Sequence, residues 1–178
     1  MDEHIPPVPT NPAYTLERLF RSARAGKRGL SQEPPEWLNA FDPGGTTGWA
    51  RFQGLHLRGS GQLDTPDMIS GPVVMRNHLQ MYPCTHMVIE NYRIYGNKKD
   101  QHVNSDVHTL RLIGAIETLL TLGYGPTKQL SLGKQLASAA KGFVTDERLE
   151  DLGLWQKGQR HARDAIRHGI YYILFGKY

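Results

Sequence analysis

The chain has 178 residues, of which 39% are apolar and 21% charged, a balance typical of a soluble protein with one folded core. No apolar run is long enough to span a membrane, the N-terminus does not resemble a secretory signal, and the single Cys84 excludes an internal disulfide or a zinc site built on cysteines. The net charge of +4 permits a nucleic-acid partner without requiring one.

Residues 1–35 are predicted to form a partly flexible N-terminal extension, because four prolines interrupt its beginning. Thr15 is a suitable N-cap for a short helix over residues 15–25. A basic cluster over residues 18–28 either contacts phosphates or lies on a solvated surface. The remaining residues, 36–178, are predicted to form one domain.

Short apolar runs and longer periodic segments alternate along that domain. They predict strands over residues 37–41, 48–53, 56–63, 85–91 and 128–132. They predict helices over residues 64–81, 106–122, 134–141, 145–153 and 159–174. This order predicts an α/β fold whose first three strands are antiparallel and whose later strands are added in parallel through helical crossovers.

Two carboxylates lie at the ends of predicted strands. Asp42 follows the first apolar run and precedes a turn rich in Gly and Thr, and Glu90 ends a run that has no polar alternation. Such a run is typical of a strand buried on both faces, where a carboxylate needs a cation or a hydrogen-bond partner. If the two strands are neighbours, Asp42 and Glu90 lie side by side. Glu117 either joins them or forms a salt bridge.

The last predicted helix has three different faces at 100° per residue. His161, Asp164 and His168 share one narrow face, small and apolar residues form a second, and three arginines form a third. His161 and Asp164 are three residues apart and can point at one ion. Alternatively, Asp164 pairs with a neighbouring arginine or with His168 while His161 faces solvent. The arginines are Arg160, Arg163 and Arg167.

Carboxylates held close together repel each other and call for divalent cations. Oxygen ligands with one imidazole favour Mg²⁺ or Mn²⁺ over zinc. Two such ions can activate a water and stabilise the leaving oxygen in phosphodiester hydrolysis. The basic and aromatic residues around these acids suit a polyanionic substrate with bases that can stack.

Three segments of this sequence resemble the metal-binding motifs of RuvC-like Holliday junction resolvases, which belong to the ribonuclease H-like nuclease superfamily. The segments are Asp42–Ala50, Val88–Glu90 and His161–His168, and the stretch Thr145–Trp155 is similar to that of the bacteriophage enzymes in particular. The resemblance covers the chain from about Leu38 onward.

The resemblance implies a ribonuclease H-like, five-stranded mixed sheet flanked by helices. It implies a homodimer that cuts four-way DNA junctions with two Mg²⁺ or Mn²⁺ ions and needs no nucleotide cofactor. Asp42, Glu90 and Asp164 would hold the ions, and His161 would be a ligand or transfer protons. We expect a cytoplasmic protein, in the host cell if it is encoded by a phage. The residues expected to contact DNA are Tyr92, Arg93, Tyr95, Lys98, Lys99, Lys134 and Lys141.

Three other interpretations stay open. A broader branched-DNA endonuclease or nickase would use the same acidic residues. Actin-like ATPases and sugar kinases share part of the turn after Asp42, but they need a second domain that 178 residues do not supply. A non-catalytic DNA-binding module would not need the carboxylates at all.

Overall fold

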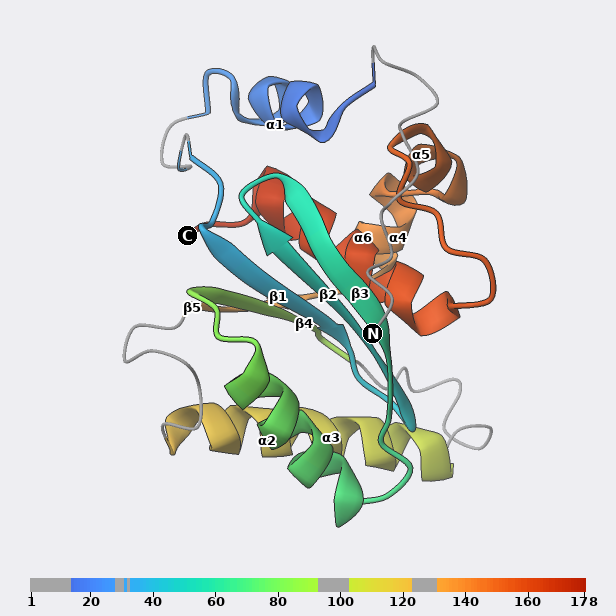
Figure 1. Ribbon diagram of the computed structural model, residues 1–178. Helices are drawn as coiled ribbons and strands as arrows, with labels where there is room; N and C mark the ends of the chain where they lie inside the picture. The colour runs from blue at the N-terminus through green and yellow to red at the C-terminus, as the bar shows by residue number, and fades with distance from the viewer. Residues whose placement is uncertain (1–13, 28–30, 32, 93–102, 123–130) are drawn as a thin grey trace.

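The computed structural model describes residues 14–27, 31, 33–92, 103–122 and 131–178, and within them a five-stranded sheet lies between two layers of helices (Figure 1). The strands are β1 (Trp37–Asp42), β2 (Thr46–Gln53), β3 (His56–Asp64), β4 (His86–Glu90) and β5 (Ser131–Gln135). The helices are α1 (Leu16–Arg24), α2 (Ser70–Met81), α3 (Val103–Thr121), α4 (Ala137–Phe143), α5 (Asp146–Asp151) and α6 (Arg160–Phe175).

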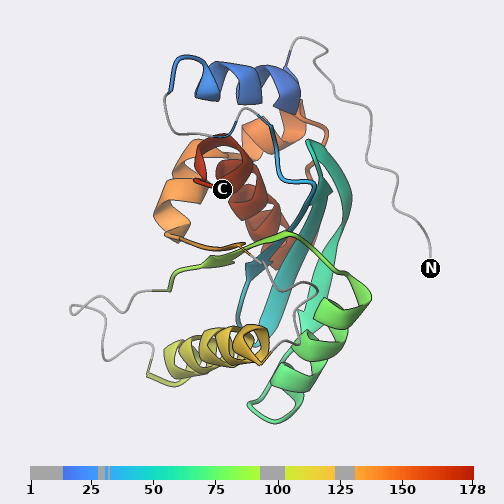
Figure 2. The same cartoon turned by 90° about the vertical axis from the view of Figure 1, so that its left-hand side faces the viewer.

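The sheet has the strand order β3-β2-β1-β4-β5. β1 pairs antiparallel with β2, and β2 with β3, whereas β4 pairs parallel with β1 and β5 with β4. Figure 2 shows α2 and α3 on one side of the sheet and α1, α4, α5 and α6 on the other. The predicted mixed α/β sheet is therefore confirmed.

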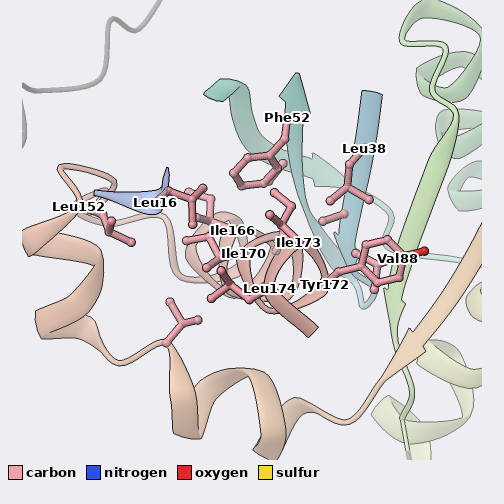
Figure 3. Close-up of a cluster of buried hydrophobic side chains, with 14 of the residues drawn as sticks. Leu16, Leu38, Phe52, Val88, Leu152, Ile166, Ile170, Tyr172, Ile173 and Leu174 are labelled. Carbon is pink, nitrogen blue, oxygen red and sulfur yellow. The ribbon is translucent and has the colours of Figure 1, made fainter. Parts of the chain in front are cut away.

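Each face of the sheet has its own apolar core. On the α6 side, Leu38 and Val88 pack with apolar residues of α6 and α1 (Figure 3). On the opposite side, Phe41 and Ile89 pack against α2 and α3. Side chains of a strand alternate between the two faces, so the residue that follows Phe41 or Ile89 points toward α6.

Helix α1 contributes to the core on the α6 side. Its N-cap is Thr15 as predicted, with the hydroxyl oxygen accepting a bond from the N–H of Arg18 at 3.3 Å. Leu16 and Phe20 are buried in that core. Arg24, part of the expected basic cluster, is 1% exposed and donates to the carbonyl oxygens of Ile173 and Gly176. Arg24 is therefore unavailable to a phosphate. The domain boundary at residues 35 and 36 stays a prediction.

Two predicted boundaries are wrong. Helix α2 begins at Ser70 rather than near residue 64, because Thr65 is held to the Asp42 turn: its N–H donates to the oxygen of Gly45, and its hydroxyl donates to that of Gly44. The last strand continues to Gln135, where the sequence predicted a helix from Lys134. Parallel pairing with β4 outweighs local helix propensity at these residues. Of the helices described, none is long and apolar enough to cross a bilayer.

Candidate active site

The ends of β1 and β4 bring two carboxylates together. The parallel register pairs Phe41 with Ile89, so Asp42 and Glu90 follow in step at the same edge of the sheet. Both side chains lie on the face that α6 covers. Asp42 is 6% exposed, which places its carboxylate in a largely dry environment.

Helix α6 crosses this edge at very short range, and two glycines make this possible. A Cβ atom on Gly48 of β2 would collide with the backbone carbonyl of His161. Near the middle of α6, a Cβ on Gly169 would collide with the ring of Phe52. These positions let α6 lie close enough for its side chains to reach the two carboxylates.

Two histidines of α6 contact the acidic pair from different sides. The Nδ1 atom of His161 lies 2.8 Å from Oδ2 of Asp42, within hydrogen-bond distance. The Nε2 atom of His168 lies 3.5 Å from Oε2 of Glu90. One ligand atom each from Asp42, Glu90 and His168 lies within 4.8 Å of the others, a spacing at which the three could hold a metal ion.

The pKa values of the two carboxyl groups are shifted in opposite directions. Burial raises the pKa of Asp42 to about 6, and neighbouring Glu90 adds to the rise although the bond to His161 opposes it. Burial also acts to raise the pKa of Glu90, but His168, Asp42 and the charge of Lys141 outweigh it and lower that pKa to about 2. The pKa of His161 is raised, chiefly by its bond to Asp42. This environment favours a bound cation.

Asp164 lies beside the acidic pair but is held by two cations. One carboxylate oxygen is 2.9 Å from Nζ of Lys141, and the other is 2.5 Å from Nη1 of Arg167. Arg167 also pairs with Asp146 and is 8% exposed, so it is not displayed on a basic face as expected. The alternative in which Asp164 pairs with a neighbouring arginine is therefore observed. His161, however, contacts Asp42 instead of facing solvent alone.

A cavity of about 760 Å³ opens in front of these groups. Asp42, Glu90 and Asp164 form its acidic wall beside His161, and Lys141 and Arg160 supply positive charge. Its other lining residues are Pro43, Gly44, Gly45, Pro66, Tyr92, His108 and Thr109.

A second cavity of about 550 Å³ shares Lys141, Arg160 and Asp164 with the first. Arg163 also lines it, and the guanidinium of Arg163 lies 4.2 Å from the ring centre of Trp155. The two cavities form a continuous polar surface along the first turns of α6.

The structure separates the expected DNA contacts into three groups. Tyr92 and Lys141 line the main cavity, while Lys134 lies on β5 and pairs with Glu117. That pair agrees with the salt-bridge interpretation of Glu117. The remaining four, Arg93, Tyr95, Lys98 and Lys99, lie outside the described residues.

His168 and Arg160 were not assigned to the site from the sequence. His168 shares a helix face with His161 and Asp164, and this pattern could have indicated that it belongs to the site. Helix periodicity does not tell, however, which strand residue that face contacts. Arg160 was placed on a separate basic face, yet it lies in the first turn of α6, where that face borders the cavity.

We expect the metal-free protein to lose stability as the pH rises from about 4 to 7. The folded-state pKa of Asp42 is raised from 3.8 to about 6, so its contribution is complete below the lower value and is lost above the higher one. The loss is about 3 kcal/mol at most. Glu90, whose folded-state pKa is lowered, affects the free energy of unfolding at a more acidic pH.

Urea unfolding in EDTA at pH 5 and pH 7.5 measures this difference. In Asp42→Asn the decrease in the free energy of unfolding between pH 5 and pH 7.5 should be smaller. The variant should also be more stable than the wild type at pH 7.5. Identical pH dependence in both proteins would show that Asp42 is not the group responsible.

Neither a known family model nor a curated protein matches the sequence. Among solved structures, the chain is similar to Thermus thermophilus RuvC in complex with a Holliday junction substrate, at 10% identity and a TM-score of 0.58 over 78% of this chain and 92% of that one. A second Thermus thermophilus RuvC structure matches at 12% identity and a TM-score of 0.54 over 78% and 93%. The chain therefore has the ribonuclease H-like α/β fold of RuvC.

Proposed function

We propose that this protein is a metal-dependent, structure-selective DNA endonuclease that resolves four-way junctions. The observation that carries the proposal is the adjacent pair of buried Asp42 and largely buried Glu90, which lines an open cavity together with His161 and Asp164. Packing does not require four ionisable groups at one point, and burying them is costly unless a cation joins them. The likeness in fold to a protein solved with a Holliday junction supports the choice of substrate.

The donor set suits Mg²⁺ or Mn²⁺, and we propose two ions. When bound, such ions activate a water and stabilise the oxygen that leaves the phosphorus. Asp42, Glu90 and Asp164, which line the same cavity, would hold the ions. His161 is positioned by its bond to Asp42, so it can serve as a ligand or accept a proton from the attacking water.

Cationic side chains next to the acids would hold the substrate backbone. Burial acts to lower the pKa of Lys141, but its bond to Asp164 and the charges of Asp42 and Glu90 raise it, so the ammonium group is charged at neutral pH. Together with Arg160 it can bind non-bridging phosphate oxygens in the main cavity. The strand would continue past Arg163 through the second cavity.

A homodimer completes the proposal, because two opposed strands of a junction need two sites. Helices α2 and α3 pack against each other and carry exposed apolar side chains that a second copy could cover. These side chains are Ile69, Val73, Met81, Val107 and Leu110.

The direct test compares a four-way junction, a flap and a linear duplex as substrates, with Mg²⁺ and with EDTA. We expect paired nicks in the junction, at least about tenfold slower cutting of the duplex, and no cleavage in EDTA. Equal cleavage of junction and flap would favour the broader branched-DNA endonuclease. No cleavage of any substrate with Mg²⁺ or Mn²⁺ would refute the proposal.

A further inference from the structure

His168 is a fully buried titratable side chain next to the site. It is 0% exposed, although histidine is a polar residue that normally finds a hydrogen-bond partner when buried. Its Nε2 atom has no hydrogen-bond partner among the described residues. The 3.5 Å separation from Oε2 of Glu90 is too long for a normal hydrogen bond. A buried nitrogen thus points at a carboxylate and leaves a gap between them.

The surrounding structure holds the imidazole in this place. The side-chain amide of Gln135 on β5 donates to the carbonyl oxygen of His168 and accepts from the N–H of Tyr172, each at 3.1 Å. Gln135 is also the register partner of Glu90. The same residue therefore fixes the turn of α6 that carries His168 beside the strand that carries Glu90.

Asp164 is less available to an ion at this depth. Each of its carboxylate oxygens already contacts a cationic side chain, Lys141 or Arg167, and Arg167 is itself buried. His168 Nε2, in contrast, faces Glu90 and has no hydrogen-bond partner among the described residues. The three ligand atoms lie within 4.8 Å of one another. Ligands around one ion with bonds of about 2.1 Å are at most about 4.2 Å apart, so an ion would draw these side chains slightly inward.

We propose that His168 is a direct metal ligand, which together with Asp42 and Glu90 forms the inner of the two ion sites. The inference rests on the metal-dependent function proposed above and adds a residue and a selectivity to it. A nitrogen ligand suits a transition metal better than Mg²⁺, which prefers oxygen. The inner site therefore prefers Mn²⁺ to Mg²⁺.

The competing explanation is that His168 is protonated and only orients Glu90. In that case its removal would weaken the binding of Mn²⁺ and Mg²⁺ by the same factor, and no imidazole nitrogen of this residue would touch the ion.

Two measurements on the intact protein separate these explanations. Titration calorimetry gives the affinities for Mn²⁺ and Mg²⁺, and pulsed electron paramagnetic resonance detects a ¹⁴N nucleus bonded to Mn²⁺. The variants are His168→Ala, His168→Asn and His161→Ala, with the exposed His56→Ala as the matched control.

We expect replacement of His168 to weaken Mn²⁺ binding by about 10- to 100-fold and Mg²⁺ binding by about threefold or less. The ¹⁴N signal should persist in His161→Ala and His56→Ala and weaken or vanish in the His168 variants. Equal losses for both metals, or a ¹⁴N signal that disappears in His161→Ala, would overturn the proposal. If neither His168 variant folds, the signal in His161→Ala still decides the question.

The outcome is independent of cleavage. A protein that binds Mn²⁺ through His168 but cuts no DNA would refute the proposed function alone. A junction-cutting protein whose Mn²⁺ carries no ¹⁴N signal from His168 would refute only this inference.

Discussion

Replacing Asp42 by Asn, or Glu90 by Gln, should reduce Mg²⁺-dependent cleavage of a four-way junction by about 1,000-fold or more. Each change keeps the size of the side chain and removes a charged oxygen ligand from the carboxylate pair at the ends of β1 and β4. Junction binding should stay within about threefold of the wild type, since the cationic side chains of the two cavities are untouched.

Single-turnover cleavage and binding in Ca²⁺ measure these two quantities separately. The matched control is Asp64→Asn, which removes an exposed carboxylate from the end of β3, at the edge of the sheet. It should cleave like the wild type. Undiminished cleavage by either Asp42→Asn or Glu90→Gln would show that this carboxylate pair does not bind the catalytic ions.

The second large effect concerns the approach of α6 to the sheet. Gly48→Ala should destabilise the fold by about 3 kcal/mol or more, because the new methyl group meets the backbone of His161 rather than a side chain that can rotate away. The displaced helix would also carry His161 and Asp164 away from Asp42. We therefore expect cleavage to fall even under conditions where the variant stays folded.

Gly45→Ala is the matched control, since a Cβ atom at Gly45 meets nothing within 4 Å. Its unfolding midpoint in urea should stay close to that of the wild type. If Gly48→Ala unfolds at the same urea concentration as Gly45→Ala, the close contact between β2 and α6 does not limit the fold.

The sequence was most informative where a pattern reflects a local physical requirement. Apolar runs identified β1 and β4, and the rule that parallel strands end at a common edge placed Asp42 beside Glu90. The helix cap at Thr15 and the boundaries of α6 followed from similar local signals. These features depend on few contacts beyond the elements that contain them.

Features that depend on the approach of distant segments were not predictable. The depth of His168 depends on the distance between α6 and the sheet, which Gly48 and Gly169 set through contacts far apart in sequence. The end of β5 depends on pairing with β4, which overrides the helical preference near Lys134. The burial of Arg24 depends on the carbonyl groups at the end of α6.

The contact between Asp42 and His161 also bears on how the protein is made. The two residues are 119 positions apart, and α6 is synthesised long after β1. A chain still emerging from the ribosome can therefore pair β1 with β2, but it cannot assemble the acidic centre with its histidines. Closing so long a loop is slow and comes late in folding. The proposed cleavage activity would thus appear only once the whole sheet and its last helix are in place.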